Sequence, residues 1–242
     1  MEDNRITMSK TLGILGGLGP LAGAHFYRRV LELTPARDDD QHLSVVLLSE
    51  RSIPSRLEHL AGQGPSPVAA LTSVARRIVQ AGAEILAIPS TTTHAYYEDI
   101  AAAVSIPVLN LLKIVADTVA QEGCRHVGMV ATSPTRDYQL YRQAFEAHGL
   151  HAVYPDERTQ REIMTIIQGV KSTNRLEPWG TRLVQVLEGR WLGQADCVLL
   201  ACTETPVVFP REARGTRQRD YPIFDATDIL AQAAISACCE GA

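Results

Sequence analysis

Short apolar runs alternate with amphipathic segments along almost all of the 242 residues of this chain. Each run is nearly continuous in its apolar character, which is typical of strands that a sheet buries on both faces. The intervening segments have the apolar spacing of helices, and several end at glycine. This alternation predicts an α/β fold with parallel sheets. The expected strands are residues 11–17, 43–49, 84–89, 106–111, 126–132, 151–155, 197–202 and 221–226.

Two pairs of similar motifs indicate an internal repeat. The stretches GILGGLGP, from Gly13, and VGMVATSPT, from Val127, each predict a strand, a turn and a helix, and they begin 114 residues apart. In the stretches LAIPSTTTH and VLLACTETP, Ser90 and Cys202 hold corresponding places, 112 residues apart. The nearly equal offsets predict two similar halves. Because ligands bind at the carboxyl ends of parallel strands, facing halves would bring Ser90 and Cys202 to one cleft.

Composition excludes several classes of protein. The apolar fraction of 45% is typical of a globular protein, and the formal charge of -4 comes without a basic stripe that would suggest nucleic acid. No apolar run approaches the roughly 20 residues that cross a bilayer. The first ten residues lack the apolar segment of a signal peptide, and the five cysteines have no zinc-type spacing. We therefore expect a cytoplasmic protein with reduced cysteines, no metal, no membrane contact and no nucleic-acid partner.

The loop after the first expected strand, GGLGPLA, matches the dinucleotide-binding pattern G-x-G-x-x-G/A through Gly17, Gly19 and Ala22. The acidic residues 38–40 precede the second expected strand instead of ending it, so the acidic part of that pattern is missing. Two interpretations of the loop stay open. It is a tight turn in which Pro20 opens a helix, or a helix start whose backbone N–H groups hold a carboxylate.

Two further segments carry candidate binding and reactive groups. Arg51 and Arg56 follow the second expected strand. Arg51 is typical of a solvated loop, whereas Arg56 could bind a substrate carboxylate through two parallel N–H donors. Cys202 ends a buried strand and precedes an expected helix, whose dipole would lower the pKa of the thiol. An inert, buried structural role for Cys202 is an equally good interpretation. Lys171, by sequence alone, is an ordinary lysine at a helix end.

Four consecutive hydroxyl residues, Ser90 to Thr93, precede His94 after the third expected strand. One of these hydroxyls is expected to cap the following helix by accepting a backbone N–H bond. Four are more than a cap requires, so the others are candidates for a binding or proton-transfer site. His94 is well placed to hold the local geometry without a catalytic role.

Taken together, these motifs resemble those of the PLP-independent aspartate/glutamate racemase family. The resemblance rests on LGILGGLGP, SIPSR, PSTTTH, ATSPT, GVK and ACTET, and it covers the chain from about Leu12 to the last helix. It implies two pseudo-symmetric flavodoxin-like halves with parallel sheets, an active site in the cleft between them, an isomerase without cofactor, and often a homodimer. The segment PIFDATDI resembles the strand and helix that return to the first half. The expected halves are residues 11–112 with 215–242, and residues 113–214.

The resemblance also implies how protons would move. Two acid/base residues, usually both cysteines, would face the substrate's α-carbon from opposite sides. Cys202 matches one of them, and the other is replaced here by Ser90. Thr91 takes the place of the asparagine that usually follows the first cysteine.

By the same resemblance, an acidic amino acid is the expected small-molecule partner. Arg56 and Lys171 would bind its side-chain carboxylate, and His94 and Glu204 would support the site. The substrate's α-carboxylate and amine would be held by a set of backbone amides and hydroxyls: Gly17, Leu18, Gly19, Thr91, Thr92, Thr132, Thr135 and Thr203.

The serine at position 90 leaves three outcomes open. An alcohol is far less acidic than a thiol, whose ordinary pKa is about 8.5, so Ser90 is a poor base at neutral pH but could still relay a proton. The first interpretation is an acidic amino-acid racemase with strong directional bias. The alternatives are a one-cysteine decarboxylase or isomerase of a related carboxylic acid, and a non-catalytic protein that binds an acidic ligand.

Overall fold

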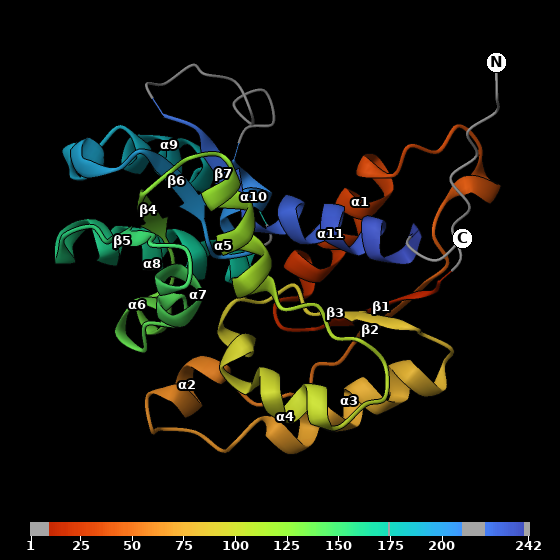
Figure 1. Cartoon of the computed structure of the whole chain (residues 1–242). Helices are drawn as coiled ribbons and strands as arrows, with labels where there is room; N and C mark the ends of the chain where they lie inside the picture. Colours follow the sequence, from red (N-terminus) through yellow and green to blue (C-terminus); the bar gives the residue numbers. More distant parts are fainter. Residues whose placement is uncertain (1–9, 174, 210–220, 240–242) are drawn as a thin grey trace, which may run out of the picture.

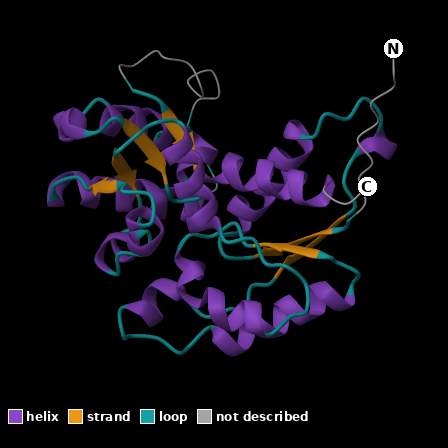
Figure 2. Ribbon diagram, in the orientation of Figure 1, coloured by secondary structure: helices purple, strands orange, loops and turns teal. Residues whose placement is uncertain are grey.

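Two separate parallel sheets form the framework of the molecule (Figure 1, Figure 2). In this computed structural model, which describes residues 10–173, 175–209 and 221–239, the first sheet has the order β2-β1-β3 and the second the order β5-β4-β6-β7. Neighbouring strands are parallel throughout. The predicted α/β class is therefore confirmed. The strands are β1 (Leu12–Gly16), β2 (Val45–Ser49), β3 (Ile85–Ala87), β4 (His126–Val130), β5 (His151–Val153), β6 (Cys197–Leu200) and β7 (Ile223–Asp225).

Helices lie against both faces of each sheet. The α-helices are α1 (Pro20–Leu33), α2 (Arg56–Leu60), α3 (Val68–Gln80), α4 (Tyr97–Ala102), α5 (Leu111–Gln121), α6 (Ser133–Asp137), α7 (Arg142–Glu146), α8 (Glu157–Thr173), α9 (Trp179–Leu187), α10 (Thr205–Val208) and α11 (Ala226–Cys239). Three 3-10 helices are η1 (Asp39–Gln41), η2 (Thr92–Tyr96) and η3 (Arg190–Gln194). Within the described ranges, no helix is long and apolar enough to cross a membrane.

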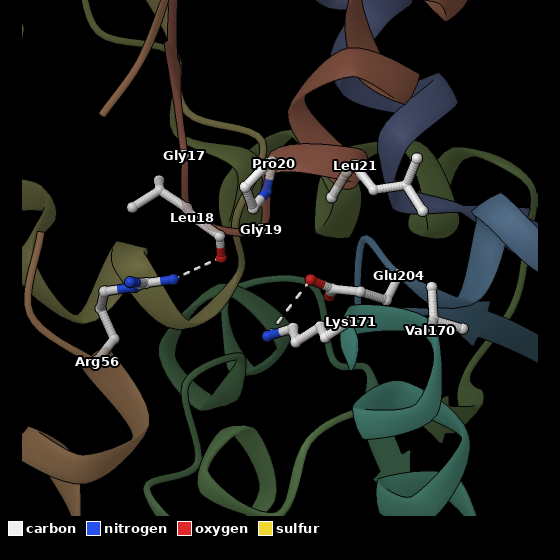
Figure 3. A pocket seen from close by; sticks show the side chains of 10 residues that line it. Gly17, Leu18, Gly19, Pro20, Leu21, Arg56, Val170, Lys171 and Glu204 are labelled. Carbon is white, nitrogen blue, oxygen red and sulfur yellow. Dashed lines mark hydrogen bonds and ion pairs between the residues drawn. The ribbon is translucent and has the colours of Figure 1, made fainter. Parts of the chain in front are cut away.

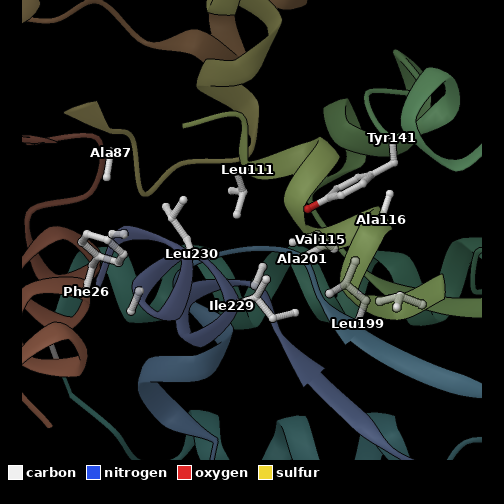
Figure 4. Packing of buried hydrophobic residues seen from close by; sticks show 14 of the residues in the cluster. Phe26, Ala87, Leu111, Val115, Ala116, Tyr141, Leu199, Ala201, Ile229 and Leu230 are labelled. Carbon is white, nitrogen blue, oxygen red and sulfur yellow. The ribbon is translucent and has the colours of Figure 1, made fainter. Parts of the chain in front are cut away.

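The buried apolar side chains form three layers. Residues of α3 and α4 pack on one face of the first sheet, and residues of α8 and α9 pack on one face of the second. Between the sheets, α1, α5, α7 and α11 share a central core (Figure 4). Along β1, Leu12 and Ile14 belong to this central core, whereas Leu15 belongs to the layer under α3. Burial on both faces explains why β1, β3 and β6, which are buried at every residue, are apolar along their whole length.

The two sheets follow the same plan. β1 lies between β2 and β3 in the first sheet, as β4 lies between β5 and β6 in the second. The next position is held by β7 in the second sheet, but only by a single bridge between Leu86 and Val108 in the first. The strand expected at 106–111 is cut short because Asn110 caps α5, its side chain accepting the Lys113 backbone N–H at 3.1 Å. This shared order matches the predicted flavodoxin-like halves.

Each half sends one helix into the other. α5 follows the bridge of the first sheet and packs on α7, whereas α11 follows β7 of the second sheet and packs on α1. The two crossing helices also pack on each other. The expectation that all of 215–242 returns to the first half is therefore wrong for β7, which pairs with β6. Residues 215–220 and 240–242 of that segment lie outside the described residues.

Close packing of α8 on α9 fixes the backbone around Lys171. A Cβ at Gly169 would lie 2.2 Å from Cζ2 of the Trp179 ring, so this contact requires a glycine. Thr173 Oγ1 accepts from Trp179 Nε1 at 3.2 Å and donates to the Gly169 carbonyl oxygen at 2.7 Å. Lys171 lies between these two positions on the last turn of α8.

We expect Gly169→Ala to lower the free energy of unfolding by about 1–2 kcal/mol. The added methyl group overpacks the contact with Trp179, which outweighs the gain of about 1 kcal/mol that alanine brings inside a helix. Thermal denaturation followed by circular dichroism measures the change. Gly193→Ala is the matched control, because no atom of the described residues lies within 4 Å of a Cβ there. A Gly169→Ala protein as stable as wild type would contradict this account of the α8–α9 contact.

Candidate active site

Loops that follow strands of both sheets line two adjoining pockets. The first, which we call the cation pocket, has a volume of about 180 Å³ and lies between the start of α1 and the side chains of Arg56, Lys171 and Glu204 (Figure 3). The second, the thiol pocket, is narrower, about 10 Å³, and is lined by Ser90 and Cys202. Lys171 and Glu204 line both pockets, so the two pockets adjoin across these side chains.

The structure brings thirteen of the fourteen predicted site residues to these pockets. His94 is the exception, and it lies buried next to the Ser90 loop. Ser90 and Cys202 come from different halves, as the internal repeat predicts. The cation pocket contains Gly17, Leu18, Gly19, Arg56, Lys171 and Glu204, and the thiol pocket adds Ser90, Thr91, Thr92, Thr132, Thr135, Cys202 and Thr203.

Hydroxyl groups are linked to one another and to the opposite half on the Ser90 side of the thiol pocket. Thr93 Oγ1 donates to Ser90 Oγ at 2.8 Å, so the Ser90 oxygen accepts there and its own O–H remains a donor. Thr91 Oγ1 donates to the carbonyl oxygen of Ala201, next to Cys202, and ties the two sides of the pocket together. The expected helix cap is wrong, because the N-cap Thr91 accepts no capping bond on its side chain.

His94 holds the Ser90 loop against the start of α5. Its Nε2 accepts the Leu111 backbone N–H at 3.0 Å, so Nδ1 carries the proton and donates to the Ser90 carbonyl oxygen at 2.8 Å. Burial lowers the pKa of the His94 imidazole, which keeps the ring neutral. This geometry matches the expected supporting role.

The sequence-based expectation of a lowered pKa for Cys202 is wrong. Cys202 precedes only a short helix, α10, whereas burial and the neighbouring Glu204 carboxylate raise the pKa of its thiol well above the usual value. Lys171 lowers that pKa to a smaller extent. The thiol donates to Glu204 Oε2 with a distance of 3.0 Å between sulfur and oxygen. In this arrangement Cys202 is protonated and suited to act as an acid.

Three charged side chains face one another in the cation pocket. Lys171 Nζ lies 3.3 Å from Oε1 of Glu204, whose side chain is 5% exposed. Arg56 donates to the carbonyl oxygens of Leu18 and Pro54, and its Nε is buried without a partner among the described residues. Burial lowers the pKa of Arg56, and attraction to Glu204 partly offsets that effect. A buried donor without a partner favours the binding of an anion here.

The glycine loop between β1 and α1 approaches its neighbours too closely for a side chain. Gly17 has a φ of +84°, and a Cβ there would lie 2.3 Å from the Glu50 carbonyl oxygen. At Gly19 a Cβ would lie 2.5 Å from Glu204 Oε1. Pro20 opens α1, as predicted, and the loop lines the cation pocket. The arrangement is compatible with the carboxylate-binding interpretation of this helix start.

The donors of this site suit an organic anion better than a metal ion. Across the described parts of the chain, no group of three or more His, Cys, Asp or Glu could hold a metal. Besides the Glu204 carboxylate and the Cys202 thiol, the groups that line the pockets are a guanidinium, an ammonium, serine and threonine hydroxyls and the amides of the glycine loop. Such groups hold carboxylates.

Two tyrosines near the site were missed in the sequence. Tyr141 is 1% exposed and lies beside Thr91 and Cys202, and burial raises the pKa of its phenol. Tyr138 Oη donates to the carbonyl oxygen of Leu60 at the end of α2 and so joins the two halves. Both lie in an amphipathic segment where a tyrosine is usually a core residue, so no local signal marks them.

A sequence profile described as Asp/Glu/Hydantoin racemase matches residues 15–234. The chain belongs to this family. Because the matched range includes both halves, it covers every predicted site residue. The predicted resemblance to aspartate/glutamate racemases and the predicted class of enzyme, an isomerase, are both confirmed.

Individual members of the racemase family resemble the chain over nearly its whole length. The broad specificity amino-acid racemase RacX of Bacillus subtilis is 23% identical over 233 residues, 93% of this chain and 96% of RacX. The structure of Picrophilus torridus aspartate racemase superimposes with a TM-score of 0.83 and 26% identity, covering 95% of this chain and 94% of that one. An aspartate racemase homologue from Pyrococcus horikoshii shares the fold, with a TM-score of 0.75, 22% identity and coverage of 96% and 100%.

We expect His94 to make stability fall with acidification. Its pKa is lowered in the folded protein, so below the unfolded value of about 6.5 the unfolded chain binds more protons and stability is lost as the pH falls towards the folded pKa. His94→Gln should be less stable than wild type by about 1–3 kcal/mol at pH about 7.5, because buried groups lose partners. On going from pH about 7.5 to pH about 5.5, the His94→Gln protein should lose less free energy of unfolding than wild type does.

Urea denaturation at the two pH values measures both effects. His151→Gln, at an exposed histidine, is the control and should keep the wild-type dependence on pH. If His94→Gln keeps that dependence too, His94 is not the buried neutral group described here.

Proposed function

We propose that this protein is a cofactor-independent racemase of an acidic amino acid of the aspartate or glutamate type. The observation that carries the proposal is that Ser90 and Cys202 line one narrow pocket. The adjoining pocket is lined by two cationic side chains, Arg56 and Lys171. Membership of the racemase family and the similarity to an aspartate racemase support it. We further propose that the protein acts as a homodimer in the cytoplasm with reduced cysteines.

Arg56 and Lys171 bind the side-chain carboxylate of the substrate in the cation pocket. The buried Nε of Arg56 supplies a donor that no described residue uses, and Lys171 borders the thiol pocket as well. The glycine loop and the threonines of the thiol pocket hold the α-carboxylate and the amine. In this proposal the α-carbon lies between Ser90 and Cys202.

Cys202 and Ser90 act on opposite faces of the α-carbon. Cys202 first gives up its thiol proton, and the resulting thiolate takes the α-proton, so the Cα–H bond breaks, an S–H bond forms and the electron pair stays on the substrate. Ser90, which accepts from Thr93, donates its O–H proton to the opposite face, and solvent then carries the proton held by Cys202 back to the serine oxygen. Because an alcohol is a far weaker acid and base than a thiol, the step through Ser90 is slow and the reaction is directional.

A one-cysteine decarboxylase is the second candidate, and the raised pKa of Cys202 favours it. Decarboxylation of a malonate-type acid breaks the bond between the α-carbon and carbon dioxide and leaves the electron pair on the α-carbon. A protonated Cys202 can then supply the proton from one face, with no second base. Carbon dioxide release from methylmalonate, with no racemisation of aspartate or glutamate, would favour this reaction.

In deuterium oxide we expect the two enantiomers of the substrate to exchange their α-hydrogen at different rates. The enantiomer that presents this hydrogen to Cys202 should exchange faster, because Ser90 is the weaker base. Cys202→Ser should lower the exchange by at least about 100-fold. Ser90→Cys should raise the rate of the slower enantiomer. Proton NMR of pure D- and L-aspartate and glutamate measures all four rates.

Two outcomes of the exchange experiment would contradict the proposal. Equal rates for the two enantiomers would exclude the asymmetric mechanism. Exchange that is absent in wild type and in Cys202→Ser, while acidic amino acids still raise both melting temperatures, would indicate a binding protein.

We expect Lys171→Met to raise KM for the acidic substrate by about 10- to 100-fold, the size of a lost charge-assisted hydrogen bond. The change also leaves the Glu204 carboxylate without its cation, which adds repulsion against the substrate. Initial-rate kinetics measure KM, and Lys113→Met, at an exposed lysine, is the control. An unchanged KM in Lys171→Met would exclude Lys171 from the carboxylate site.

A further inference from the structure

Glu204 is a buried carboxylate that touches both pockets of the site. Its Oε2 accepts from the Cys202 thiol at 3.0 Å and lies 3.5 Å from Thr203 Oγ1. Its Oε1 lies 3.3 Å from Lys171 Nζ and faces Gly19 of the glycine loop (Figure 3). One carboxylate therefore contacts both the reactive thiol and the cation that the proposed function assigns to the substrate.

Lys171 cannot serve two carboxylates equally well. When a substrate carboxylate reaches the cation pocket, two carboxylates lie close to Lys171, and like charges so close disfavour keeping both of them ionised. The substrate carboxylate has Arg56 as a second partner, so Glu204 is the group that gains a proton. The nearest proton is the one on Cys202.

We propose that Glu204 is the proton acceptor for Cys202 and that the side-chain carboxylate of the substrate triggers this transfer. The S–H bond of Cys202 breaks, an O–H bond forms on Oε2 of Glu204, and the negative charge moves from the carboxylate to the sulfur. The net charge of the site does not change. Lys171 is released from Glu204 for the substrate, and a thiolate now lies in the thiol pocket.

The proposal rests on the proposed function and adds a source of substrate specificity. Burial, with the contact to Glu204, keeps Cys202 protonated until a second carboxylate arrives. A neutral amino acid brings no charge to the cation pocket, so it leaves Lys171 paired with Glu204 and the thiol intact. Selection for acidic amino acids then acts on the rate of proton removal as well as on binding.

Few charged or titratable groups of the described chain act on this pair. Lys171 and Arg56 face Glu204 from α8 and α2, and Tyr141 lies near Cys202 from the residue before α7. Lys171 and Arg56 are the cations that the substrate engages, so substrate binding changes the surroundings of Glu204 directly.

Thiolate formation tests the proposal without any turnover. Ultraviolet difference spectroscopy at neutral pH follows the thiolate band when succinate, a dicarboxylate without an amine, is added, with acetate as the monocarboxylate control. We expect succinate to produce the band in wild type and in Glu98→Gln, an exposed matched control, but not in Glu204→Gln or Cys202→Ser. Absence of the band in a wild-type protein whose melting temperature succinate raises would overturn the proposal.

Kinetics on the acidic substrate separate proton transfer from binding. Glu204→Gln should lower kcat by about 10²- to 10⁴-fold without raising KM, because it removes an acceptor and also a competitor for Lys171. Its kcat should keep rising with pH where that of wild type is level, since the thiol then has to lose its proton to solvent. A raised KM with unchanged kcat would instead make Glu204 a binding residue. Glu204→Asp keeps the charge but moves the carboxylate away from the thiol. Its kcat should lie between those of wild type and Glu204→Gln.

The two experiments fail in different ways. A succinate-induced thiolate in a protein that racemises neither aspartate nor glutamate would retain the role of Glu204 and contradict the proposed function. Racemisation with no succinate-induced thiolate, and with full kcat in Glu204→Gln, would retain the function and contradict the role of Glu204.

Discussion

Burial of α5 and α11 between the two sheets is the constraint on which the rest of the structure depends. The central core contains Phe26 of α1, Leu111 of α5 and Leu230 of α11, and full burial of each such side chain contributes roughly 1.5–3 kcal/mol. Because each crossing helix starts in one half and packs in the other, this core also holds the two sheets at a fixed separation. Only then can loops from different halves share a pocket as narrow as the one between Ser90 and Cys202.

Within that framework, one buried carboxylate determines the electrostatics of the site. Glu204 accepts from the thiol of Cys202 on one side and pairs with Lys171 on the other. Burial, and after it the charge of Glu204, raises the pKa of the Cys202 thiol. The site thus combines a proton donor with a cation that is already paired. Arg56 differs, because its buried Nε has no hydrogen-bond partner in the described part of the chain, which favours an anion as its partner.

Much of the fold could be predicted because the burial of a strand is visible in its own residues. The shared pocket of Ser90 and Cys202 could also be predicted, because the internal repeat gives the two residues corresponding places at the ends of strands in the two halves. Sequence does not show which sheet a short strand joins, so the place of β7 was missed. The direction of the Cys202 pKa was also missed, because a thiol responds to its burial and to charges such as Glu204 and Lys171, which meet only in the folded chain.

Because the two halves belong to one chain, the groups that face the two sides of the substrate can differ. Were the halves two identical subunits related by a true twofold axis, a single substitution would alter both faces at once, and a serine on one side would mean a serine on the other. Here both halves lie in one chain, so positions 90 and 202 are encoded separately. The two halves keep a similar arrangement while one side carries an alcohol and the other a thiol. Proton transfer can therefore differ between the two faces of the α-carbon.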